Sequence, residues 1–186
     1  MDHEETIVSY AKSELERIEH VYGGPAYRCA AVLKDSVTLP CVVLASAEIA
    51  TELALRRFEE TRADSALRKL KRRFGSGMEY RDIVKSFVTS GNCVNSYDIA
   101  RLEKSRFAIP LARLKEVKGE TRMSWTQFTA VMKDGREFAF GTNYLREFFQ
   151  MPDGYAGDDI VKIIPNRAEG NILRERPYFT CYVSGL

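Results

Sequence analysis

The chain has 186 residues, of which 45% are hydrophobic and 29% are charged, and its 28 Lys and Arg side chains nearly balance 26 Asp and Glu. This composition excludes a disordered chain of low hydrophobicity, a collagen-like repeat and a disulfide-rich miniature protein. The length and the apolar fraction together predict one soluble domain with a hydrophobic core.

The first quarter of the chain predicts an acidic helix followed by a β-hairpin. Apolar residues recur near helical spacing over residues 4–20, and a Gly-Gly-Pro sequence at residues 23–25 ends that pattern. Residues 26–34 and 37–45 then predict two strands rich in Val, Cys and Ala. Because both faces of these strands are largely apolar, we expect a sheet that is covered on both sides. Pro40 predicts that its strand lies at an edge or carries a bulge.

The length of the hairpin loop determines whether its two cysteines, Cys29 and Cys41, face each other. A three-residue loop at Lys34–Ser36 would set Cys29 opposite Cys41, whereas a two-residue loop would remove the match. Directly opposed residues come close enough for a disulfide, although that geometry is uncommon. We expect reduced thiols that are neighbours in a core, and the Cys29–Cys41 disulfide is the minor alternative.

The middle of the chain predicts helices. Ser46 is suited to cap a long helix with apolar residues on one face. A sequence that resembles a capping box favours a division at Thr61, into helices over residues 47–60 and 62–74. Residues 80–88 predict another amphipathic helix.

The second half of the chain predicts an antiparallel sheet with short helices. Residues 123–133 and 136–141 flank an Asp134-Gly135 turn, which is the clearest hairpin signal in the sequence. The other elements are a segment ambiguous between strand and helix (97–109), short helices (110–117 and 143–150) and strands (160–164 and 177–183). The order of elements predicts a single α+β domain over residues 1–186, with a weak boundary near residues 75–95.

The near-neutral total charge hides an uneven distribution along the chain. Residues 1–20 hold six acidic and two basic side chains, a net charge of −4. Residues 56–73 hold eight basic and three acidic side chains, a net charge of +5. The sequence therefore predicts an acidic start and a basic middle.

The basic helix gives the first functional hypothesis. Its densest cluster of cations consists of Arg68, Lys69, Lys71, Arg72 and Arg73. A helix that turns five cations toward phosphates gains affinity mainly through counterion release. No recognised DNA-binding module frames this helix. The alternatives are a solvated helix face, on which the cations complement the negative end of the helix dipole, and a contact with a protein.

Other kinds of site have weaker sequence support. Cys93 lies in a polar loop and is the best candidate for a reactive thiol, with His20 as a candidate base. The acidic residues of the Gly-rich stretch 153–159 lack the closing carboxylate of a cation loop, and a turn at Asp153-Gly154 and capping by Asp158 account for them. The Gly-Ser-Gly sequence at residues 75–77 matches no phosphate-binding loop. We therefore expect no cofactor, no metal and no catalytic constellation.

These observations predict a non-catalytic macromolecule-binding protein, with nucleic acid as the first candidate partner of residues 56–73. The alternative is a protein-binding inhibitor, adaptor or accessory factor, in which the acidic residues 1–20 and the basic middle contact a partner or a second copy. An enzyme of unrecognised type comes third. The start of the chain carries no signal-peptide pattern and the longest apolar stretch is too short to cross a bilayer, so we expect a cytoplasmic protein without a membrane partner.

Overall fold

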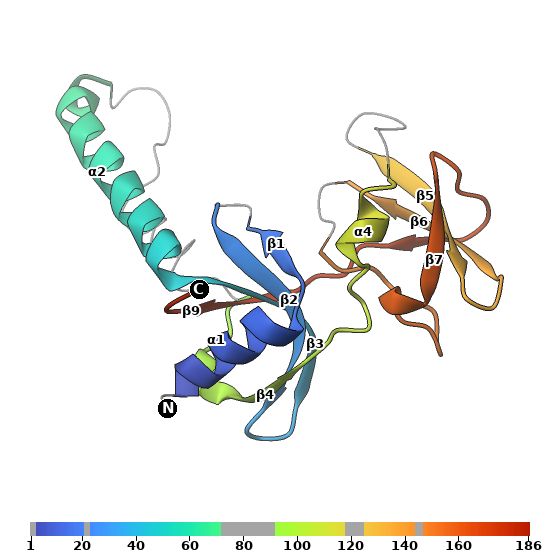
Figure 1. Cartoon of the computed structure of the whole chain (residues 1–186). Helices are drawn as coiled ribbons and strands as arrows, with labels where there is room; N and C mark the ends of the chain where they lie inside the picture. The colour runs from blue at the N-terminus through green and yellow to red at the C-terminus, as the bar shows by residue number, and fades with distance from the viewer. Residues whose placement is uncertain (1–2, 21–22, 72–91, 118–124, 144–146) are drawn as a thin grey trace.

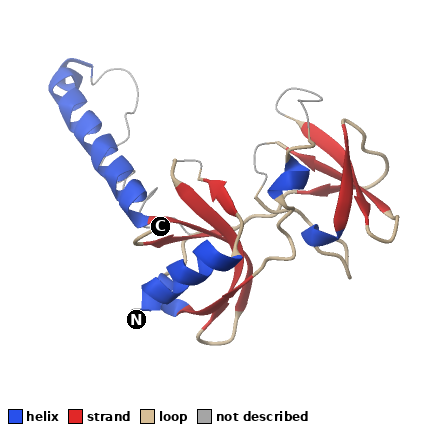
Figure 2. Ribbon diagram, viewed as in Figure 1, coloured by secondary structure: helices blue, strands red, loops and turns tan. Residues whose placement is uncertain are grey.

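The computed structural model of the chain describes residues 3–20, 23–71, 92–117, 125–143 and 147–186, with side chains for all of these except residues 61–71. Helices combine with two β-sheets (Figure 1), which confirms the α+β class (Figure 2). The helix predicted at residues 80–88 lies outside the described residues, and the number of domains stays a prediction. No helix in the described ranges is long and apolar enough to cross a membrane.

The first sheet combines strands from both ends of the chain. Its strands are β1 (Arg17–Glu19), β2 (Pro25–Leu33), β3 (Thr38–Ser46), β4 (Ile99–Glu103) and β9 (Phe179–Val183). The order is β1-β2-β3-β9, and β4 pairs with the second half of β2, beyond the end of β1. β9 runs parallel to β3, so the end of the chain returns to the sheet in which it began.

Both faces of the first sheet are covered, as the apolar strands predict. Helix α1 (His3–Glu14) packs on one face, where Ile7 and Ala11 join Cys29, Val42 and Cys181 in a buried cluster. The opposite face contributes Ala26, Cys41, Val43 and Ala45 to a second cluster, which it shares with the aromatic residues of the second sheet. Because β2 and β3 are buried on both sides, they read as nearly continuous apolar runs.

The loop of the β2–β3 hairpin has three residues, as one alternative assumed, yet Cys29 does not face Cys41. Leu33 N–H donates to Val37 O at 2.8 Å, and Ala31 lies opposite Leu39. A bulge then shifts the register by one residue, which sets Cys29 opposite Val42. The bulge includes Pro40 and confirms that part of the prediction. The Cys29–Cys41 disulfide is therefore wrong, and so is the expectation that the two thiols are neighbours: they lie on opposite faces of the sheet, and both are free cysteines.

Helix α2 (Ala47–Lys71) is a single helix of 25 residues, and the predicted division at Thr61 is wrong. Its N-terminal cap is the predicted one, since Ser46 Oγ accepts the N–H of Ile49 at 3.3 Å. Figure 1 shows that α2 leaves the first sheet at the end of β3 and extends away from both sheets. The capping-box-like sequence at Thr61 is therefore internal, where the continuous hydrogen bonds of the helix leave it no end to cap.

The second sheet is built around the predicted Asp134-Gly135 hairpin. Its strands are β5 (Thr126–Met132), β6 (Glu137–Thr142), β7 (Ile160–Pro165) and β8 (Ile172–Arg174), in the order β7-β5-β6-β8. β8 pairs with β6 in parallel, and the other two pairs are antiparallel. The ambiguous segment 97–109 contains the end of a 3-10 turn (Ser96–Asp98) and strand β4. Pro110 precedes the short helix α4 (Leu111–Leu114), as expected.

Part of the predicted helix over residues 143–150 is wrong, because residues 147–150 are not helical. Phe149 forms an isolated β-bridge with Glu175, and its N–H donates to Phe107 O at 2.9 Å. This extended backbone places Phe148 and Phe149 fully inside the shared core, where Phe149 packs edge-on against Phe128 and Phe140. Burial of these large rings stabilises the fold by more free energy than a single turn of helix would, because so short a helix is marginally stable.

Three hairpins of the chain close in the same way. In each, the N–H of the first residue donates to the carbonyl of the fifth, and the N–H of the fourth donates to the carbonyl of the first; the hairpins span residues 20–24, 33–37 and 132–136. The fourth residue has a left-handed φ, and it is Gly23 (88°), Ser36 (71°) or Gly135 (84°). Ser36 therefore adopts a conformation that favours glycine.

We expect Ser36→Gly to raise the free energy of unfolding by about 0.5–1 kcal/mol, because glycine removes the cost of a left-handed φ at an exposed loop position. Chemical denaturation measures the change. Gly135→Ala is the matched control and should lower the free energy of unfolding by about 1 kcal/mol, since its Cβ meets no atom within 4 Å and only the backbone conformation is affected. A loss of stability in Ser36→Gly would contradict this account.

Candidate functional site

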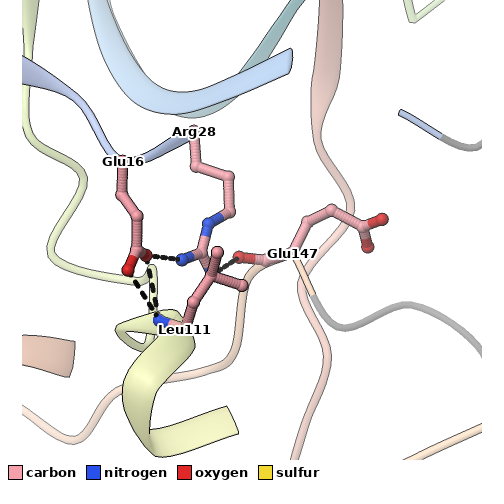
Figure 3. Close-up of polar contacts among 4 residues, drawn as sticks. All are labelled: Glu16, Arg28, Leu111 and Glu147. Carbon is pink, nitrogen blue, oxygen red and sulfur yellow. Dashed lines mark hydrogen bonds and ion pairs between the residues drawn. The ribbon is translucent and has the colours of Figure 1, made fainter. Parts of the chain in front are cut away.

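A charged pair lies between the two sheets, on the face of the first sheet that carries the shared core. Glu16 lies between α1 and β1, directly opposite Arg28 in the register that pairs Arg17 with Tyr27. Arg28 Nη2 donates to Glu16 Oε2 at 2.5 Å (Figure 3). Only 3% of the Arg28 side chain is exposed, against 43% for Glu16. The pair thus holds a guanidinium inside the protein and a carboxylate at its surface.

Both members of the pair also bind distant parts of the backbone. The Glu16 carboxylate accepts the N–H of Leu111, the first residue of α4, at 2.9 and 3.0 Å. Arg28 Nη1 donates to the carbonyl of Glu147 at 3.2 Å. Figure 3 shows the four groups converging from separate elements. The pair therefore fixes α4 and the chain before Phe148 against the first sheet.

Arg28 keeps its charge in this environment. Burial lowers the pKa of its guanidinium, and the nearby carboxylate of Glu16 opposes that shift. The ordinary pKa of arginine lies so far above neutrality that the side chain stays a cation. One of its nitrogens, Nε, is buried without a hydrogen-bond acceptor. Such an unsatisfied donor is costly and is characteristic of strained or functional positions.

Arg28 separates two hollows. The larger has a volume of about 670 Å³ and lies between β1 and α4, with a lining formed by Arg17, Ile18, Glu19, Arg28, Leu111, Leu114, Lys115, Val117 and Glu147. The smaller, of about 210 Å³, lies on the Glu16 side and includes Lys104, Ser105 and Asp158. The larger hollow, which we call the β1 cleft, has the size of a ligand pocket.

One feature of the sequence points to this site. Arg28 is the single charged residue in the strand Pro25–Leu33, whose other residues are apolar apart from Tyr27. A charge inside a strand that is buried on both sides requires a partner. The partner's identity depends on pairing across the hairpin, which periodicity alone does not give.

The predicted basic cluster lies at the far end of α2. Residues 68, 69 and 71 belong to the last turns of the helix, but their side chains are outside the described ones, as are Arg72 and Arg73 altogether. Burial decreases along the described side chains of α2. Ala50 and Leu53 are buried, whereas no side chain from Ala54 to Glu60 is buried, and Leu55 is 58% exposed.

The acidic N-terminal segment is partly neutralised within the fold. Glu4 accepts a hydrogen bond from Ser96 Oγ at 2.5 Å, and Glu16 is paired with Arg28. At least two of the six acidic residues in this segment are therefore used internally. This weakens the segment as an electrostatic surface for a partner.

The thiol and carboxylate candidates have structural explanations. The His20 ring packs edge-on against Tyr182, with centroids 6.4 Å apart, and burial lowers its pKa. Cys93 is half-buried, and its backbone forms an isolated parallel β-bridge with Thr180. Asp159, rather than Asp158, closes its turn, because Asp159 Oδ2 accepts the N–H of Ala156 at 2.8 Å. Within the described ranges, no three His, Cys, Asp or Glu side chains are grouped to hold a metal ion.

No family model, curated protein or solved structure matches the chain. The function is therefore inferred from the geometry and charge of this chain alone.

We expect Glu16→Ala to lower the free energy of unfolding by about 2–3 kcal/mol. The substitution leaves Arg28 buried without its carboxylate and removes the acceptor of the Leu111 N–H; the loss falls below that of a fully buried pair because Glu16 is half-exposed. Chemical denaturation measures the loss. The control is Glu103→Ala, which breaks an exposed pair with Arg101 and should change stability by less than about 0.5 kcal/mol. Equal effects of the two variants would show that the Arg28 pair is no anchor.

We expect iodoacetamide at pH 8 to modify Cys93 before the other three thiols. Burial raises the pKa of Cys41 to about 11 and that of Cys181 to about 12, and it raises the pKa of Cys29 as well. A thiol with a pKa of 11 is only about one-thousandth thiolate at pH 8, and the thiolate is the reactive form. Mass spectrometry of time points gives the order. Labelling of Cys93 well below the ordinary thiol pKa would favour the enzyme hypothesis, and labelling of Cys41 as fast as Cys93 would contradict the expected order.

Proposed function

We propose that the chain is a cytoplasmic, non-catalytic macromolecule-binding protein and that the basic segment 56–73, most of which belongs to α2, binds a nucleic acid. The observation that carries this proposal is the projection of α2. The helix has 25 residues, about 37 Å at 1.5 Å per residue, and Leu53 is the last buried residue among its described side chains. Its basic half therefore extends beyond the sheets (Figure 1).

The first turns of α2 are fixed to the rest of the fold, and the following residues, 54–71, form the part of the helix that we call the arm. Ser46 caps its first turn, and Glu48 Oε1 accepts the N–H of Gly185 at 2.9 Å, which ties the helix start to the chain end. The Ile49 side chain fills the space where any side chain at position 24 would lie, so Gly24 permits close packing there. These contacts fix the first turns of α2 and therefore set the direction in which the rest of the helix extends.

The charge of the arm favours a polyanion. Arg56 and Arg57 are exposed, and the Arg57–Glu60 pair, at 3.4 Å, is exposed on both sides and contributes little. Beyond them, Arg68 and Lys71 are three positions apart, which places them on one face of a helix. Cations in this arrangement release counterions on binding to phosphates.

A protein partner is the second candidate, favoured by Leu55. This side chain is 58% exposed on the arm, beside Arg56 and Arg57. An apolar side chain flanked by arginines is typical of a protein-binding surface. The same arm would then bind an acidic protein, as an adaptor or accessory factor does.

We expect a variant with Lys71→Glu, Arg72→Glu and Arg73→Glu to lose binding to a generic duplex oligonucleotide at low salt. Wild-type binding should weaken steeply as salt rises, because each phosphate contact adds about 0.9 to the slope of log affinity against log salt. Fluorescence polarisation at several salt concentrations measures both.

The matched control is Lys34→Glu, Arg101→Glu and Arg136→Glu, which changes the net charge equally at exposed positions in two hairpin turns and in β4, away from α2. This control should keep most of the affinity of the wild type. If the wild type does not bind the oligonucleotide at low salt, or if both triple variants lose affinity equally, the basic segment 56–73 is not a nucleic-acid-binding site. A stoichiometric complex with a protein in sizing experiments would then favour the second candidate.

A further inference from the structure

Strand β1 presents its edge, rather than one face, to the β1 cleft. All three of its residues, Arg17, Ile18 and Glu19, line the hollow. Successive side chains of a strand point to opposite faces, so three consecutive lining residues indicate a cleft that runs along the strand. β1 pairs with β2 on its other side, and in the strand order of the sheet it is the terminal strand.

The register shows which backbone groups face outward. His20 N–H donates to Gly24 O at 3.0 Å, and the same register pairs Ile18 with Ala26. Because hydrogen-bonded and non-bonded pairs alternate along an antiparallel ladder, Ile18–Ala26 is a bonded pair and the residues on either side of Ile18 are not. Arg17 and Glu19 therefore turn their N–H and C=O groups away from β2. Pro25, which has no N–H, lies opposite Glu19 at a position where none is needed.

These outward groups are available for pairing. No hydrogen bond among the described residues uses the outward N–H or C=O of Arg17 or Glu19. An edge strand with unpaired backbone groups is a template for another strand. Its short length limits the risk of aggregation and at the same time sets the size of the segment that fits.

The opposite wall of the cleft supplies apolar contacts. Leu111, Leu114 and Val117 line it, and Ile18 contributes from the β1 side. The charges around the cleft are mixed: Arg17, Arg28 and Lys115 are cations, and Glu19 and Glu147 are anions. The two carboxylates disfavour a phosphate backbone. A protein segment with apolar side chains and charges of both signs complements this lining.

We propose that the β1 cleft binds an extended peptide segment of a partner protein, which pairs with β1 through backbone hydrogen bonds. The segment adds a strand beside Arg17 and Glu19 and places an apolar side chain against Leu114 and Val117. Three or four residues, about 10–13 Å of strand, match the length of β1. The proposal goes beyond nucleic-acid binding by α2 and does not depend on it.

The test uses decapeptides selected from a random display library on the full chain, then synthesised and measured by fluorescence polarisation. Glu19→Pro removes the outward N–H and leaves the bonded Ile18 pair in place, a substitution that edge strands tolerate. Glu19→Ala is the matched control, because it removes the carboxylate and keeps the N–H. We expect a loss of about tenfold or more for Glu19→Pro and a loss of no more than about threefold for Glu19→Ala.

A second measurement needs no variant of the protein. Methylation of single peptide amides should weaken binding to the wild type at alternate positions only, since every second amide of an added strand points to β1. Equal affinities of the wild type and Glu19→Pro, equal losses in the proline and alanine variants, or uniform effects of methylation would each overturn the proposal. Failure of the library to yield any binding peptide would overturn it too.

Discussion

The buried cation of Arg28 is the constraint on which the arrangement of the two sheets depends. A guanidinium in a strand that is covered on both faces is stable only where its desolvation is offset. Glu16 supplies the opposite charge from the segment between α1 and β1, and the carbonyl of Glu147 supplies a second acceptor. The same carboxylate accepts the N–H of Leu111, so one ion pair connects four segments of the chain. Satisfying the charge therefore also fixes the position of α4.

The β1 cleft is a consequence of this polar anchor. The aromatic core joins the sheets through Phe148 and Phe149, whereas near Arg28 the junction is made by directed hydrogen bonds. Hydrogen bonds hold groups at fixed distances without filling the space beside them, unlike packed side chains. The cleft remains open between β1 and α4 for this reason. Because β1 is the terminal strand beside the first half of β2, and β4 pairs only with the second half of β2, no strand in the described part of the chain pairs with the outer edge of β1.

The elements that the sequence predicts correctly have local determinants. Alternating apolar residues and an Asp-Gly turn define the β5–β6 hairpin, and Ser46 marks the start of α2. The features that the sequence predicts wrongly depend on contacts between residues that are far apart in the sequence. The bulge at Pro40 changes the partner of Cys29, and the bridge from Phe149 to Glu175 replaces a helix. Likewise, Arg28 is visible in the sequence as a lone charge, but Leu111 lies 95 residues from Glu16 and no periodicity connects them. Strand register and long-range contacts determine these features, and local propensity predicts neither of them.

The two proposed surfaces differ in the physics of recognition, which separates them experimentally. Residues 56–73 carry a net charge of +5, so a polyanion bound there would be held mainly by counterion release, which weakens as salt rises. The β1 edge offers backbone hydrogen bonds beside an apolar wall, and its charges of both signs nearly cancel. Binding there depends on strand geometry and is much less sensitive to salt. A macromolecule that contacts this chain through both surfaces would therefore lose the α2 contact with rising salt and keep the β1 contact.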